Sequence, residues 1–299
     1  MALVRDVSPL TQPTIVRRVD SSLRLSFALD AATQTSVLAE CSSEPPLKVV
    51  RAFTLEDGAA LVHIHNVSGG LLGDDRLTVS VILQENAKVQ LTTTGATRIY
   101  RARKEAGPAT QTTEISLGPN AFLEYLPDPI IPFRSARYCQ RTSIRLAPGA
   151  GLFWWEILAP GREAHGELFA YDSVEIKTDL TAGARLFACE RVRLQPHKYP
   201  PSSPARLGPY RYWATFYICR IGLETGRWIA LEDRLREVAN EFTRPGEMLW
   251  GVSTLVAHGL VCRGVVLRGR DALFGLHQLW RAAKAALYGR EAVPPRKVS

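Results

Sequence analysis

The residues most able to do chemistry begin with a glycine-rich segment that ends in two carboxylates. In HNVSGGLLGDDRL, three glycines, Gly69, Gly70 and Gly73, precede Asp74 and Asp75. A phosphate-binding loop is not indicated, because the Lys-Ser or Lys-Thr pair of a P-loop is missing and a strand pattern follows instead of a helix. From these residues alone, a tight bend between strands is favoured over a ligand site.

A second acidic segment, LEYLPDPIIPF, places Glu124 and Asp128 among apolar residues. Its prolines fix the backbone φ angles around both carboxylates, so the side chains should be held in defined positions.

A third segment, EILAPGREAHGELF, carries Glu156, Arg162 and Glu167. An arginine among buried acids commonly forms an internal ion pair, and this structural reading weighs about as much as a functional one.

His63 and His65 alternate along a predicted strand, so both imidazoles should project from one face, where they could chelate a metal. Because no cysteine or third histidine is near in sequence, a half-exposed strand face is the favoured interpretation. The five cysteines are odd in number and far apart, which argues against a disulfide framework and a zinc site. The sequence shows no Ser-His-Asp, Cys-His or G-x-S-x-G arrangement.

The elements that must position these residues are mostly strands. Residues 22–194 repeat apolar side chains at every second position between turn residues, and Asn86 predicts the turn of a hairpin. Residues 195–209 are rich in proline and serine and predict a loop. Spacings of three and four then predict two helices, at about 227–243 and 271–288. We expect a single domain over residues 1–299.

Composition limits the class of protein. The chain has 299 residues, 46% of them hydrophobic, and a net charge of +8 with a pI near 9.4. Its arginines are scattered and accompany no nucleic-acid-binding motif, so we expect no nucleic-acid partner. The first ten residues lack an apolar signal region, and no apolar stretch approaches the roughly 20 residues that span a bilayer. We therefore expect a cytoplasmic protein without a membrane segment.

Several of these segments together resemble one known family. The pattern N-x-S-G-G-x-x-G-G-D of the urease accessory protein D family, called H in some bacteria, is matched by Asn66, Ser68, Gly69, Gly70, Gly73 and Asp75. QLTTTGATRIYRA, LEYLPDPIIPF, PGREAHGE and LWRAAKAALYG follow in the order found in that family. The sequence departs from the family pattern at Asp74, where a second glycine is usual, and in the tail PPRKVS, which replaces P-R-x-W-x-T.

The resemblance implies a mainly β fold, an irregular β-helix-like stack of short strands with a small α-helical part near the C-terminus. It also implies a non-catalytic scaffold without a permanently bound cofactor. Such a scaffold would bind apo-urease, recruit accessory protein F and, through it, the GTPase accessory protein G, and help to deliver nickel(II), for which the family suggests an internal passage.

On this basis the sequence assigns roles to three sets of residues. For transient nickel contact we expect the carboxylates of Asp74, Asp75, Glu124, Asp128 and Glu167. For the lining or structure of the passage we expect Ser68, Gly69, Gly70, Gly73, Thr92, Thr93, Thr94 and Arg162. For partner docking we examine Trp228 and Trp280, since large aromatic side chains anchor interfaces, although core packing would explain either alone.

Two other classes of protein remain as alternatives. A carbohydrate-active β-helix enzyme would pair Glu124 with Asp128, or Glu156 with Glu167, as acid and base. A β-rich binding module unrelated to urease would need no catalytic group at all.

Overall fold

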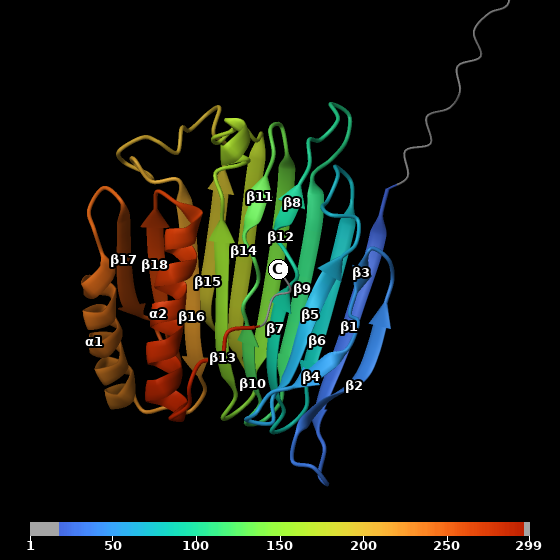
Figure 1. Cartoon of the computed structure of the whole chain (residues 1–299), viewed down its shortest axis with the longest axis vertical. Coiled ribbons are helices and arrows are strands. Elements are labelled where there is room, and N and C mark those ends of the chain that lie inside the picture. Colours follow the sequence, from blue (N-terminus) through green and yellow to red (C-terminus); the bar gives the residue numbers. More distant parts are fainter. Residues whose placement is uncertain (1–17, 296–299) are drawn as a thin grey trace, which may run out of the picture.

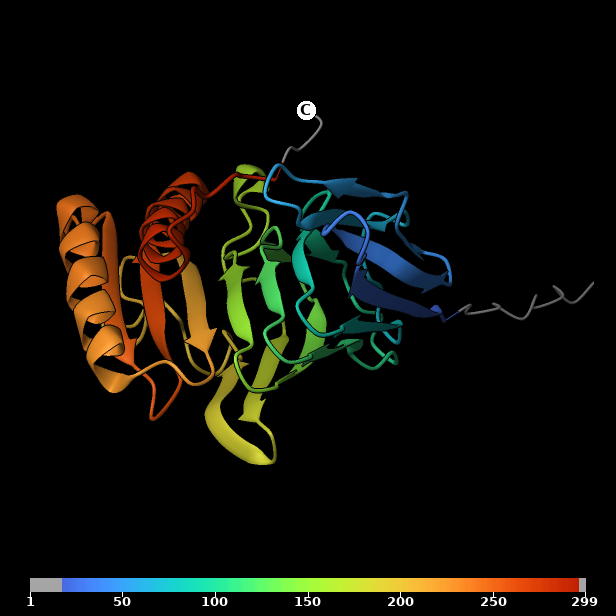
Figure 2. The same cartoon turned by 90° about the horizontal axis from the view of Figure 1, so that it is seen from below.

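Two facing β-sheets form the body of the protein, and two helices cover part of one of them (Figures 1 and 2). The structure is a computed structural model, and it describes residues 18–295. The altered tail seen in the sequence falls largely outside this range, in residues 296–299.

The first sheet contains, in spatial order, β15 (Arg185–Leu194), β14 (Ser173–Ala182), β12 (Arg137–Leu146), β9 (Ala109–Leu117), β6 (Arg76–Leu83), β1 (Asp20–Leu29) and β2 (Ser36–Ser43). The second sheet contains β17 (Met248–Thr254), β18 (Gly259–Val266), β16 (Tyr212–Arg220), β13 (Gly151–Leu158), β10 (Phe122–Tyr125), β7 (Lys88–Thr93), β5 (Ala60–Asn66) and β3 (Leu47–Lys48). The short strands β4 (Ala52–Thr54), β8 (Thr97–Ile99) and β11 (Ile130–Pro132) join its margin.

The chain alternates between the two sheets from β5 to β14, so strands consecutive in sequence often face each other across the core. Within each sheet these strands are parallel, as in β6 with β9 and β12 with β14. The alternation is the arrangement expected of a β-helix-like stack, and the prediction of a mainly β fold with a helical part near the C-terminus is confirmed.

The hairpin predicted at Asn86 is wrong. Asn86 does turn the chain, with φ 60°, but β6 lies in the first sheet and β7 in the second. The sequence pattern shows that each strand has a buried face and does not show which strand pairs with it.

Strands β16, β17 and β18 follow the proline-rich loop, where the sequence predicted only helices. Both faces of β16 are buried, because Tyr217 and Cys219 pack between the sheets while Phe216 and Ile218 pack under the helices. A strand buried on both faces lacks the period of two that reveals a strand.

The helices α1 (Thr225–Phe242) and α2 (Gly269–Tyr288) begin two residues before the predicted positions. Neither is long and apolar enough to cross a membrane, and no other helix in residues 18–295 is either. A short 3-10 helix, η1 (Glu163–His165), lies in the loop after β13.

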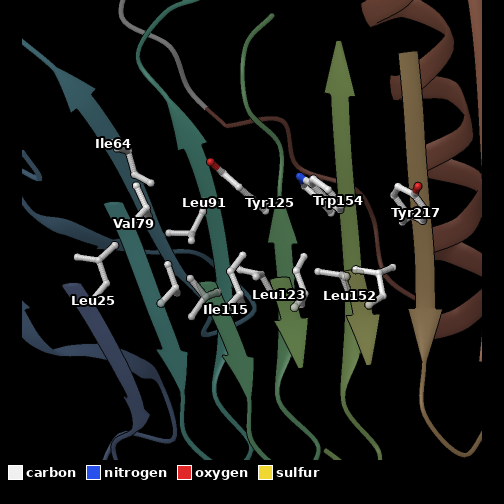
Figure 3. Close-up of a cluster of buried hydrophobic side chains, with 14 of the residues drawn as sticks. Leu25, Ile64, Val79, Leu91, Ile115, Leu123, Tyr125, Leu152, Trp154 and Tyr217 are labelled. Carbon is white, nitrogen blue, oxygen red and sulfur yellow. The ribbon is translucent and has the colours of Figure 1, made fainter. Parts of the chain in front are cut away.

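Two hydrophobic layers hold the fold together. One lies between the sheets and includes Val79 and Ile115 from the first sheet and Leu91 and Leu123 from the second (Figure 3). The other lies between the second sheet and the helices. Burying a side chain of this size stabilises the fold by about 1.5–3 kcal/mol, so the two layers supply most of the driving force.

The two tryptophans predicted for docking belong to the second layer. Trp228 is 5% exposed and Trp280 is fully buried. Neither ring is presented to a partner, so the structure gives both a packing role. The large apolar side chains that the helices do expose are Ile229 and Phe274.

A buried ion pair joins the second sheet to α2. Glu124 on β10 accepts hydrogen bonds from Lys284 Nζ (2.8 Å) and Trp280 Nε1 (2.6 Å), and the Glu124 and Lys284 side chains are each only 3% exposed. Burial raises the pKa of the Glu124 carboxyl, against the opposing effect of Lys284 and Trp280. This carboxylate is fixed by the helix and is a structural group.

We expect Lys284→Met to lower the free energy of unfolding by about 3–5 kcal/mol, because it leaves the Glu124 charge buried without its cation. The double variant Glu124→Gln, Lys284→Met should recover most of that loss, since both charges are then gone. Urea unfolding of the two single variants and the double variant measures the coupling. Equal losses in the Lys284→Met and double variants would contradict it.

Candidate functional site

A polar cavity of about 170 Å³ lies between the two sheets. The first sheet contributes Gln111 and Thr113 from β9 and Gln140 and Thr142 from β12, and the second contributes Tyr125, Trp154 and Glu156. These side chains interrupt the apolar layer, because neighbouring inward positions of the same strands carry Ile115, Ile144, Leu123 and Leu152.

One end of the cavity reaches the protein surface beside two loops. Asn66, Gly69, Gly70 and Leu71 line this end together with residues 93–98 and Asp128, whereas Ser68 does not, and Thr94 and Gly95 are exposed. We call this end the open mouth. Thr93 Oγ1 donates to Asp128 Oδ2 (3.1 Å) and accepts from the Asp128 backbone N–H (2.9 Å), so this pair is held in place at the mouth.

The glycines of the first motif shape the mouth. The backbone beside Gly70 bonds to β8 through Leu71 N–H to the Arg98 carbonyl (2.8 Å). A Cβ on Gly70 would lie 2.6 Å from that carbonyl oxygen and 2.7 Å from the Tyr100 ring, so only glycine fits. Gly69 has φ +78°, and Ser68 Oγ donates to Asn66 Oδ1 (2.6 Å) within the same turn. The prediction of a tight bend describes this segment correctly.

The two aspartates after the glycines bind backbone and do not line the cavity. Asp75 is 6% exposed and accepts from Val19 N–H (3.0 Å) and Leu72 N–H (2.7 Å). Asp74 has φ +73°, a conformation that glycine adopts freely and aspartate tolerates, and it accepts from Gly107 N–H (2.7 Å). The aspartate therefore keeps the left-handed bend and adds a tie to the neighbouring loop.

Glu167 also has a structural partner. It is 5% exposed and accepts two hydrogen bonds from Arg162, at 2.9 and 2.6 Å, and one from Arg134 N–H at 3.2 Å. These bonds lower the pKa of Glu167 to about 2, mainly through the guanidinium of Arg162. The internal ion pair weighed from the sequence is present.

Of the five carboxylates predicted to contact nickel, only Asp128 lines the cavity. Asp74, Asp75, Glu124 and Glu167 are engaged elsewhere in the fold. Among the threonines, Thr93 and Thr94 line the cavity, whereas Thr92 points to the other side of β7 and donates to the Leu126 carbonyl (2.7 Å). Gly73 is likewise outside it, packed against Ala102 and Ala106.

Glu156 is the functional candidate that sequence reasoning missed as a passage residue. It lines the cavity, and Gln140 Nε2 donates a hydrogen bond to its carboxylate across the gap between the sheets. Burial raises the pKa of Glu156 to about 8, the Gln140 bond opposes this, and the charge of Glu190 adds to it. The alternation of side chains along a strand could have identified it, because Glu156 lies two and four residues after Trp154 and Leu152 and therefore shares their buried face.

The histidine pair lies away from the cavity. Ile64 between them packs in the core, so His63 and His65 face the other side of β5, where the His63 ring meets Phe53 edge to face. Burial and the neighbouring His63 lower the pKa of His65. Within residues 18–295, no three His, Cys, Asp or Glu side chains gather closely enough to hold a metal ion.

The carboxylate pairs required by the carbohydrate-active alternative are not assembled. Glu124 bonds to the helix layer while Asp128 lines the cavity, and Glu167 bonds to Arg162 while Glu156 lines the cavity. What the cavity offers is two carboxylates, several hydroxyls and three amides in a narrow polar space.

Comparison with known proteins places the whole described fold in one family. A family model described as UreD urease accessory protein matches residues 19–299. A urease accessory protein UreD of Herpetosiphon aurantiacus is 46% identical over 285 residues, which cover 95% of this chain and 98% of that protein. One of Pseudomonas fluorescens strain Pf-5 is 34% identical over 278 residues, covering 92% and 93%.

We expect Glu156→Gln to become more stabilising as pH rises. The ordinary carboxyl pKa is 4.5 and the folded value is about 8, so between these values the folded protein holds a proton that the unfolded chain has lost, and stability falls with rising pH. Glutamine does not titrate, so the variant does not lose stability in this way as pH rises. Its melting temperature should match wild type at pH 5 and exceed it by several degrees at pH 8, since 1 kcal/mol shifts Tm by roughly 2–4 °C. The exposed Glu114→Gln variant serves as control, and a constant difference across this range would contradict the assignment.

We expect Glu167→Gln to destabilise the protein by about 1–2 kcal/mol at neutral pH, after allowance for solvent screening at the partly exposed Arg162. The pKa of Glu167 is lowered in the folded state, so its contribution is complete above 4.5 and is lost as pH falls toward 2. Denaturant unfolding at pH 7 and pH 3 should show the difference between wild type and variant shrinking. The same difference at both pH values would refute this role.

Proposed function

Because the chain belongs to the UreD urease accessory protein family, we propose that it works as a non-catalytic scaffold in urease maturation and that its inter-sheet cavity is part of a path for nickel(II). In this proposal the chain acts in the cytoplasm, binds apo-urease and recruits accessory protein F, which brings the GTPase accessory protein G. Its role as a urease accessory protein also removes the reason to consider a binding module unrelated to urease.

The donor chemistry of the cavity is the observation that supports the path. Its polar lining includes the carboxylates of Asp128 and Glu156, the hydroxyls of Thr93, Thr113 and Thr142, and amides, with Arg98 as its one cationic side chain; no cysteine or histidine is among the described residues that line it. Nickel(II) binds imidazole and thiolate more tightly than isolated oxygen donors. An oxygen-lined space therefore suits an ion that must pass through without being retained.

The positions of the two carboxylates also support a path for a cation. A divalent cation that enters a narrow space within the apolar layer between the sheets loses part of its hydration, and a carboxylate compensates part of that cost. Asp128 stands at the open mouth and Glu156 lies deeper, so a cation entering at the mouth would meet one carboxylate after the other. A resident metal is not part of the proposal, because nickel(II) is the cargo.

The experiment is co-expression of the urease subunits and accessory proteins with variants of this chain. The double variant Asp128→Asn, Glu156→Gln should lower the nickel content and activity of purified urease by about tenfold, because each lost carboxylate weakens cation binding in the cavity. Glu114→Gln, which removes an exposed carboxylate outside the cavity, should leave both unchanged. Pull-down of apo-urease should be equal for all three.

Wild-type nickel content in the double variant, with the pull-down intact, would refute the path. Failure of the wild-type chain to recover apo-urease or accessory protein F would refute the scaffold role itself. The two parts of the proposal are therefore tested separately.

A further inference from the structure

Polar side chains continue across the first sheet beyond the cavity. Thr113, Thr142, Thr178 and Glu190 are register partners on the neighbouring strands β9, β12, β14 and β15. Register partners point to the same side of a sheet, and the flanking Ile176 and Leu180 of β14 pack between the sheets. The four residues therefore form one inward row at a single level.

A second row crosses the second sheet in the same direction. Glu156, Thr215 and Arg263 are register partners on β13, β16 and β18. Their strand neighbours Trp154, Tyr217 and Val261 pack in the layer between the sheets, so this row faces the first sheet.

Polar side chains join the two sheets at two places along these rows. Gln140 on β12 meets Glu156 on β13 beside the cavity. Farther along, Glu190 on β15 accepts a hydrogen bond from the Tyr217 hydroxyl on β16 and another from Arg263 Nη2 on β18 at 3.3 Å. We call Glu190, Tyr217 and Arg263 the far cluster.

Between these contacts lie two hydroxyls without a partner. Thr178 is 1% exposed and Thr215 is 3% exposed, and the Oγ1 atom of each has no hydrogen-bond partner. A buried hydroxyl left unpaired costs about 1–3 kcal/mol, and native proteins usually satisfy such groups with internal water. One unpaired hydroxyl from each sheet therefore continues the polar side chains past Glu156 toward the far cluster. We call the cavity together with the two rows the lane.

The far cluster lies at the protein surface. Arg263 is 51% exposed, whereas the Glu190 side chain is 13% exposed. Arg263 also lines an open groove with Val192, Leu194, Trp213 and Leu249. Behind the cluster, the Tyr217 ring stacks on Trp154, which lines the cavity, with centroids 5.3 Å apart and planes at 13°.

We propose that the lane has a second opening on this groove, and that Glu190 closes it by binding Tyr217 and Arg263 at the same time. The polar rows, the unpaired hydroxyls and the bridging carboxylate are all accounted for by a closed far end. A cation approaching from the lane would compete with Arg263 for the Glu190 carboxylate. When the cation replaces Arg263 as the partner of Glu190, the far end of the lane opens. Only the identity of the travelling ion rests on the proposed function.

Substituted-cysteine labelling tests the second opening without urease or nickel. Thr178→Cys places a thiol in the lane, and the probe is the small cationic reagent 2-aminoethyl methanethiosulfonate, with labelling of each cysteine followed by peptide mass spectrometry. The exposed native Cys189 reports reagent activity in the same sample. Thr215→Cys gives a second probe from the facing sheet.

Adding Arg263→Met should raise the labelling rate at position 178 by about tenfold, because it removes one charge-assisted bond that holds Glu190 closed. The matched control is Arg193→Met. Arg193 lies on β15, the strand that carries Glu190, but it pairs with Glu175, so its loss should leave the labelling rate unchanged. Ala96→Trp, which narrows the open mouth, should not reduce the rate in the Arg263→Met background.

An unchanged rate after Arg263→Met at both probe positions, with normal labelling of Cys189, would overturn the second opening. So would a rate that Ala96→Trp abolishes, because the reagent would then enter only at the open mouth. Failure of nickel transfer in the co-expression experiment, with the labelling result as expected, would instead refute the proposed cargo and leave the second opening in place.

Discussion

The structure depends on the parallel register that each sheet keeps while the chain alternates between sheets. Because neighbouring strands are in step, side chains at one level lie side by side across many strands. A shift of one residue in any strand would turn its inward set outward and break the rows. The bend before β6 helps to fix that register, since Asp75 ties Leu72 within the bend and Val19 at the start of β1.

This register makes a polar lane compatible with a stable interior. The polar levels at Thr142 and Glu156 lie beside apolar levels at Ile144 and Trp154 on the same strands. A second apolar layer under the helices supports the other face of the second sheet. Stability therefore comes mainly from side chains outside the lane, and the lane can differ in composition from the rest of the core.

Much of the fold could be predicted from the sequence, and the failures have a common cause. The period of two reveals strands with one buried face, and the period of 3.6 reveals α1 and α2. Neither period contains information on strand partners, which is why a turn at Asn86 was taken for a hairpin. Strands such as β16 carry apolar residues on both faces because a layer covers each side, so they show no alternation.

The part of the cavity lining that the sequence motifs could indicate is the open mouth, where loop segments form it. Gly69, Gly70, Thr94 and Asp128 lie in loops, Thr93 ends β7, and all five line the cavity. Glu156 lies within the apolar strand FWWEIL, and its partner Gln140 is 16 residues away on the opposite sheet. Such a contact depends on which strands face each other, so no local pattern predicts it.

The partners of the buried carboxylates decide which of them could take part in the nickel path that we propose. Glu124 and Glu167 are bound by Lys284 and Arg162, and an incoming cation would have to displace a charge that already neutralises them. Glu156 accepts a hydrogen bond from the neutral amide of Gln140, and burial raises its pKa to about 8, so in the proposed path a cation arriving there would compete with a proton and with no charged side chain. The sequence marks all of these acids alike, and only the fold separates Glu124 and Glu167, which are paired with cations, from Glu156, whose hydrogen-bond partner is neutral.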